Sequence, residues 1–64
     1  MKPHQDRVVE ERQELAAKIE RLQAFVNGPQ FTVIGPDERE RLLRQLVVMH
    51  SYERVLGERI AAFV

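Results

Sequence analysis

Two segments with helically spaced apolar residues, separated by a short stretch of helix-breaking residues, constrain this chain more than any other feature. The break contains Asn27-Gly28-Pro29 and Gly35-Pro36. Asn or Gly after a helix can adopt a left-handed conformation, and proline cannot continue a helix. Proline does suit the first position of a new helix, where its missing N–H would be unpaired in any case. The sequence therefore predicts two helices joined by one connector.

The apolar residues recur with a helical period in both segments. In the first segment they are Val8, Leu15 and Leu22, with Ile19 and Val26 interleaved. In the second they are Leu42, Leu46, Met49, Leu56, Ile60 and Phe63. This spacing is typical of a coiled-coil seam. The predicted fold is an all-α, antiparallel two-helix hairpin in a single domain covering residues 1–64, with a helix at about 4–27, a connector at 28–36 and a helix at about 37–63.

Two positions depart from the seam pattern. Arg12 interrupts the interleaved row of Ile19 and Val26, where an apolar residue is expected. Gly57 lies inside the second helix, at a cost of about 1 kcal/mol relative to Ala. Two interpretations of Gly57 remain open, namely close packing where the helices meet and space for a ligand. In the connector, we expect Phe31 and Ile34 to cover the end of the hairpin rather than to form a strand, because no partner strand is available.

Composition narrows the class of protein. Ten Lys and Arg residues balance ten Asp and Glu residues. This balance argues against a general polyanion binder, which would carry a basic excess, but leaves room for a local basic pocket. The polar N-terminal residues do not resemble a secretory signal, and the longest apolar run of the second segment, 46–49, is far too short to span a membrane. Because the chain also contains no Cys, we expect a cytoplasmic protein.

A hairpin of this size needs additional stabilisation. Below about 70–80 residues a single core rarely suffices, and this chain has neither disulfides nor an evident metal cluster. The second helix also carries apolar residues on the flanks of its seam, namely Val47, Val48 and Val55, next to cations. We therefore expect a homo-oligomeric helical bundle that covers these flanks. A cation buried there needs an anion, either a carboxylate of a neighbouring chain or a ligand phosphate.

The sequence offers little for catalysis. Ser51 follows His50 directly, and adjacent side chains on a helix diverge. The metalloprotease, Gly-rich phosphate-loop and CxxC motifs are all absent from the sequence. His4 and His50 lie on different predicted helices, so we interpret them as surface groups rather than metal ligands. We expect a protein that is not an enzyme and that has no cofactor and no metal.

The chain resembles a family of bacteriophage proteins in both its seam and its polar positions. The polar positions that carry the resemblance are His4, Gln5, Arg7, Lys18, Tyr52 and Arg59. With the seam residues, they are similar to the helical hairpin shared by anti-CBASS and anti-Thoeris sponge proteins. The resemblance implies an assembly, commonly a hexamer, that binds cyclic oligonucleotide immune signals between protomers without cleaving them. It also implies action in the cytoplasm of an infected bacterial host, with neither a membrane nor duplex nucleic acid as a partner.

The resemblance assigns ligand binding to particular residues. Lys18 matches a lysine in the middle of the family's first helix, and Arg59 matches an arginine near the end of the second. Where relatives present an aromatic ring near the N-terminus, this chain has Pro3-His4, and a neutral imidazole can stack on a base. The implied ligand-binding residues are His4, Arg7, Lys18, Tyr52 and Arg59. Cations for phosphates and flat or apolar platforms for bases are the groups that such a ligand needs.

Two other functions remain open at this stage. A homodimeric four-helix bundle can bind structured RNA through one helix face, as plasmid copy-number regulators do. The face available for this would contain His4, Arg7, Lys18, Arg21 and Phe25, but Glu11 and Glu14 within it argue against RNA. The third interpretation is a structural coiled-coil scaffold without any ligand.

Overall fold

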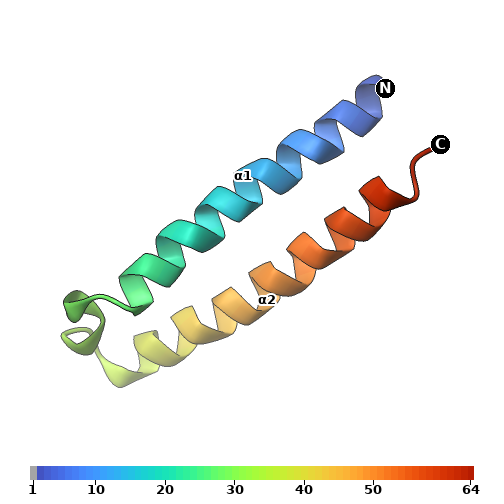
Figure 1. Ribbon diagram of the computed structural model, residues 1–64. Coiled ribbons are helices and arrows are strands. Elements are labelled where there is room, and N and C mark those ends of the chain that lie inside the picture. The colour runs from blue at the N-terminus through green and yellow to red at the C-terminus, as the bar shows by residue number, and fades with distance from the viewer. Residues whose placement is uncertain (1) are drawn as a thin grey trace.

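In the computed structural model, which describes residues 2–64, the chain forms an antiparallel helical hairpin (Figure 1). Helix α1 spans Pro3–Val26, the short 3-10 helix η1 spans Pro29–Thr32, and helix α2 spans Pro36–Ala61. The hairpin measures 47 × 14 × 13 Å, and the start of α1 and the end of α2 lie at the same, open end of it (Figure 1). The predicted two-helix, all-α architecture is confirmed for the described residues. The homo-oligomer stays a prediction.

The helix bounds differ slightly from the predicted ones. Each helix begins one residue earlier than expected, α1 ends one residue earlier, and α2 ends two residues earlier. Proline occupies the first helical position in both cases, which its fixed φ favours. At the start of α1, the side-chain Oε1 of Gln5 accepts a hydrogen bond from the backbone N–H of Lys2 at 3.1 Å. This contact gives the nearly buried Gln5 side chain a polar partner.

The end of α1 does not use the left-handed conformation that the sequence suggested. Asn27 has φ −84° and ψ −5°, and Gly28 is extended with φ −91° and ψ 170°. The reason is Pro29, because the residue before a proline is driven toward extended backbone. The break in the helix therefore comes from proline, and the expectation of a left-handed Asn or Gly was wrong.

The connector packs on the end of α1. The rings of Phe25 and Phe31 meet edge to face, with 6.4 Å between their centroids and 88° between their planes. Thr32 Oγ1 donates to the Pro29 carbonyl at 2.9 Å, and Arg39 Nη1 donates to the Thr32 carbonyl at 3.3 Å. As predicted, this segment forms no strand, and Phe31 covers the end of the hairpin.

The core is the single seam between α1 and α2. Its buried apolar residues are Val8, Leu15, Ile19, Leu46 and Leu56, and partly buried neighbours extend it along the hairpin. All five belong to the predicted rows. Leu56 is the most deeply buried, with no exposed surface. A seam this narrow leaves most of both helices open to solvent.

Truncation of Leu56 tests how far the fold depends on the seam. Leu56→Ala should lower the free energy of unfolding by about 2–5 kcal/mol, because it removes buried methyl groups and leaves a cavity. Val33→Ala is the matched control, since Val33 is 82% exposed in the connector, and should change the free energy by less than about 0.5 kcal/mol. Urea denaturation followed by circular dichroism measures both. Equal effects would show that the seam does not dominate stability.

Candidate functional site

One ion pair lies within the apolar seam. Arg12 and Glu53 occupy seam positions of α1 and α2, and Arg12 Nε donates to Glu53 Oε1 at 2.9 Å. Their side chains are 43% and 28% exposed, so the pair is partly shielded from water. This contact explains the interruption at Arg12. The helical spacing alone did not identify its partner, although Glu53 fills the gap in the seam of the second helix between Met49 and Leu56.

Gly57 makes room for this arginine. A Cβ atom at Gly57 would lie 3.0 Å from both Cζ and Nη2 of Arg12, and 3.3 Å from Nη1. Contacts that short are tighter than ordinary packing, so a side chain here would push the guanidinium away. Of the two interpretations of Gly57, close packing where the helices meet is therefore supported, and the group that packs is the Arg12 side chain.

A second polar contact joins the helices beside this pair. The Tyr52 hydroxyl donates to Glu11 Oε2. Successive helical residues are about 100° apart, so Tyr52 and Gly57 lie on opposite sides of the seam. We call one surface the tyrosine side, comprising the flank of α1 with Glu11 and a flank of α2 with Arg41, Val48, Tyr52, Val55 and Arg59. We call the other the glycine side, where α2 carries Leu43, Val47, His50, Arg54 and Gly57.

The five predicted ligand-binding residues are all exposed and all lie on the tyrosine side. Lys18 is seven residues beyond Glu11 toward the connector, and Arg59 is seven residues beyond Tyr52 toward the open end. At 1.5 Å per residue, each is about 10 Å from the Glu11–Tyr52 contact, in opposite directions. Lys18 and Arg59 of one chain are thus about 20 Å apart, too far to contact one phosphate.

The other predicted residues fall toward the open end. His4 lies seven residues before Glu11, which brings it to the level of Arg59, and Arg7 lies one turn closer to Tyr52. The hairpin therefore gathers His4, Arg7, Tyr52 and Arg59 in one half of the tyrosine side. It leaves Lys18 in the other half. A ligand that contacts the complete predicted set must bridge more than one chain.

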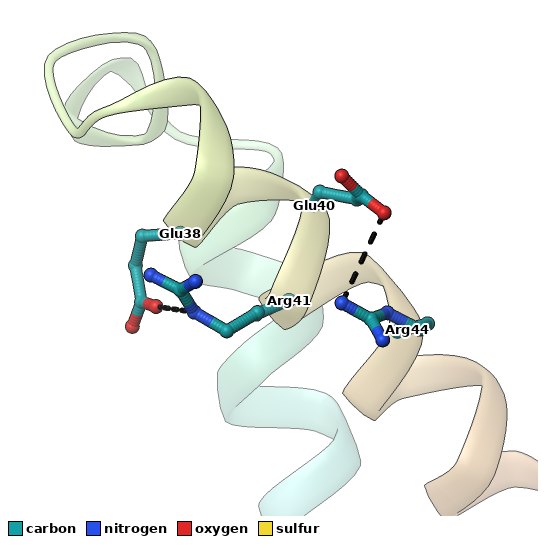
Figure 2. A network of polar contacts seen from close by, with 4 residues as sticks. All are labelled: Glu38, Glu40, Arg41 and Arg44. Atoms are coloured by element: carbon teal, nitrogen blue, oxygen red, sulfur yellow. Dashed lines mark hydrogen bonds and ion pairs between the residues drawn. The ribbon is translucent and has the colours of Figure 1, made fainter.

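The Lys and Arg residues of the hairpin fall into two groups, those that form an ion pair within residues 2–64 and those that do not. Within residues 2–64, the ion pairs are Arg12–Glu53, Arg41–Glu38 and Arg44–Glu40. Figure 2 shows the last two near the start of α2, with N–O distances of 2.7 Å and 3.9 Å. Both are exposed, and exposed pairs contribute about 1 kcal/mol or less. Arg7, Lys18 and Arg59 have no such partner in the described chain and are available to an anion.

Apolar side chains surround these cations. On the tyrosine side, Val48 is 65% exposed and Val55 is 49% exposed. On the glycine side, Val47 and Leu43 are comparably exposed. The sequence predicted apolar residues on both flanks of the seam, and the structure leaves them uncovered in a single chain. That a second chain covers them stays a prediction.

The glycine side also has a hollow of about 420 Å³ beside the Arg12–Glu53 pair. None of the five predicted ligand-binding residues lines it. Within residues 2–64, no helix is long and apolar enough to cross a membrane. In that same part of the chain, no three His, Cys, Asp or Glu side chains are grouped to hold a metal ion.

A family model described as Sequestin matches residues 2–62, almost the entire hairpin. The chain belongs to the Sequestin family. It is also 40% identical, over 63 residues and 98% of each chain, to an uncharacterized 7.5 kDa protein in the denB-rIIB intergenic region of Enterobacteria phage T4. No solved structure matches the chain. The expected resemblance to phage proteins is confirmed at the level of the Sequestin family and a phage relative.

A double-mutant cycle tests the packing of Arg12 on Gly57 in this Sequestin-family protein. In an Arg12→Ala background, Gly57→Ala should raise the free energy of unfolding by about 1 kcal/mol, the full gain in helix propensity. With Arg12 present the gain should be smaller by about 0.5–1 kcal/mol, because the new methyl group displaces the guanidinium from Glu53. Urea denaturation provides the four values.

The control for this cycle is Ser51→Ala. Ser51 is exposed on the outer face of α2. This substitution should change stability equally in both backgrounds. If Gly57→Ala also gave equal gains with and without Arg12, the contact between the two residues would contribute nothing to the seam.

Proposed function

We propose that this protein is a phage-type sponge that sequesters cyclic oligonucleotide immune signals, namely cyclic di- or trinucleotides. It holds them between protomers of a homo-oligomer without cleaving them, and so blocks host anti-phage signalling in the cytoplasm of the infected bacterium. Membership of the Sequestin family and a phage relative support the sequestering role. The anti-CBASS or anti-Thoeris type of ligand is the finer part of the proposal and rests on the resemblance of the polar positions.

The observation that carries the proposal is the composition of the tyrosine side. Arg7, Lys18 and Arg59 have no ion-pair partner within residues 2–64, and they flank the half-exposed ring of Tyr52. Phosphates need such cations, and bases stack on aromatic rings with about 1–3 kcal/mol each. A site of this kind serves a ligand that has both groups, although the whole chain has no net charge.

The spacing of the cations favours a site shared between chains. Lys18 and Arg59 of one chain lie about 20 Å apart, on either side of Tyr52. A two-fold axis at the level of Tyr52 would bring Lys18 of one chain to the level of Arg59 of the partner subunit. The exposed Val48 and Val55 would supply the apolar contact around that axis. An isologous pairing of this kind repeats each cation, which suits a ligand with internal symmetry.

The alternative of RNA binding receives less support. The face of α1 that would contact RNA includes Glu11, and that carboxylate accepts the hydrogen bond of Tyr52 across the seam. A carboxylate fixed in the middle of the face would repel the phosphates of a nucleic acid. Proteins bind nucleic acids largely by neutralising those phosphates with cations. A ligand-free scaffold would leave the unpaired cations without a role. Thermal-shift assays with cyclic nucleotides and short RNA hairpins separate the three functions, since only a bound ligand stabilises the fold.

The ligand contacts can be tested by substitution. Lys18→Ala and Arg59→Ala should each weaken binding of one class of cyclic nucleotide by about 2–4 kcal/mol, because a charge-assisted contact is lost in every repeated site. Arg59→Lys should lose much of the affinity if the arginine contacts a phosphate through two nitrogens. Isothermal titration calorimetry on the folded variants measures these effects.

The matched control for the binding test is Arg44→Ala. Arg44 is exposed on the outer face of α2 and is paired with Glu40 (Figure 2). Its removal should leave affinity unchanged. If Lys18→Ala and Arg59→Ala bound every cyclic di- and trinucleotide as the native protein does, the site assignment would have to be abandoned.

The oligomer is tested separately. Light scattering coupled to size exclusion should give a mass several times the 7.5 kDa of one chain. Val48→Glu should lower that mass, because it places a charge in the apolar surface of the proposed contact. Val33→Glu, which changes an equally apolar but more exposed residue of the connector, should not. A folded monomer in the native protein would contradict both the sponge and the RNA-binding bundle.

A further inference from the structure

We propose that the hollow on the glycine side binds a guanine-type nucleobase, as a second small-molecule site. Its volume is about 420 Å³, and its lining includes Arg12, His50, Glu53, Arg54, Gly57 and Glu58. The inference does not rest on the proposed function, because the hollow lies on the opposite side of the seam from Tyr52 and Arg59.

Gly57 and Arg12 together form part of the wall of the hollow. The Arg12 guanidinium lies directly over the bare backbone of Gly57, where a side chain would displace it. The volume of the hollow falls within the range of about 300–1,000 Å³ that is typical of small-molecule sites. An arginine guanidinium is planar and stacks on flat rings, so the wall that Arg12 forms suits an aromatic base.

The polar groups of the hollow include both donors and acceptors. The Nε atom of Arg12 donates its hydrogen bond to Glu53. Within residues 2–64, the Nη1 and Nη2 atoms of Arg12 donate to no protein acceptor. Arg54 adds a second guanidinium that is in no ion pair in this part of the chain. Glu53 keeps its second carboxylate oxygen, and Glu58 contributes two more. A ligand here must therefore offer acceptors to arginine and donors to carboxylate.

Guanine presents these two edges together. With the ring stacked on Arg12, its O6 and N7 atoms accept hydrogen bonds from Arg54, and its N1 and N2 groups donate to a carboxylate. Adenine offers N7 to an arginine and N6 to a carboxylate, but it has neither the adjacent acceptor pair nor the adjacent donor pair of guanine, so it forms fewer of these contacts. A bare phosphate is disfavoured because the two arginines are balanced by two glutamates. The lining therefore selects guanine over adenine and over an inorganic oxyanion.

An NMR titration of the ¹⁵N-labelled full chain tests the proposal. Guanosine 5′-monophosphate should shift the amide signals of His50, Arg54 and Gly57, and adenosine 5′-monophosphate should require about tenfold higher concentration for the same shifts. Inorganic phosphate should not shift them. Equal shifts by the two nucleotides, or shifts of the same size by phosphate alone, would overturn the assignment to guanine. So would the absence of any shift at these amides.

Matched variants locate the site. Arg54→Gln and Glu58→Gln should each weaken binding of guanosine 5′-monophosphate by about tenfold, because each removes one side of the recognition. Arg44→Gln and Glu40→Gln make the same changes in a pair of the same spacing on the same helix, outside the hollow, and should have no effect. Equal losses in both sets would indicate non-specific charge effects and overturn the proposal.

A last pair of variants separates this site from the tyrosine side. Lys18→Ala and Arg59→Ala should leave the shifts at His50, Arg54 and Gly57 unchanged. If they abolished those shifts, the nucleotide would be bound on the tyrosine side, and the hollow would not be a site. Failure of cyclic nucleotides to bind would, by contrast, leave the titration with guanosine 5′-monophosphate unaffected.

Discussion

The ion pair between Arg12 and Glu53 favours one register of the two helices, and the arrangement of side chains on both sides of the hairpin follows from that register. A seam of interchangeable aliphatic residues has little to prevent one helix from sliding past the other by one turn. A charged residue at one seam position of each helix removes that freedom, because a slipped register would place both charges against apolar neighbours. The 2.9 Å contact joins residues 41 positions apart. Gly57 completes the arrangement by leaving space for the guanidinium.

The same register gives the hairpin two sides of different chemistry. On the tyrosine side, cations that form no ion pair within residues 2–64 lie beside exposed apolar residues and a tyrosine ring, which suits a ligand with phosphates and bases. On the glycine side, two arginines and two glutamates balance around a hollow, which suits a neutral polar ring. A two-helix hairpin has no interior to hold a ligand. Its chemistry therefore lies on its flanks, and its sites take their shape from how the helices are aligned.

Assembly and function are linked in such a thin protein. Val47 and Val48 are each 65% exposed, and because successive helical residues are about 100° apart, α2 carries an apolar surface on each side of its outer face. The proposed sponge would use one of these surfaces to bring cations from two chains together. A ligand bound between chains would then also stabilise the assembly, because a ligand that binds only the folded oligomer shifts the equilibrium toward that oligomer.

The sequence by itself determined the two helices, the seam and the break, because helical period and proline act over a few neighbouring residues. It also placed His4, Arg7, Lys18, Tyr52 and Arg59 on exposed flanks of those helices. Local period does not encode how far one helix is shifted along the other. The tertiary structure alone therefore decided that Arg12 meets Glu53, that Tyr52 meets Glu11, and that Lys18 lies about 20 Å from Arg59. Each of these depends on contacts between residues about 40 positions apart, which only the folded hairpin brings together.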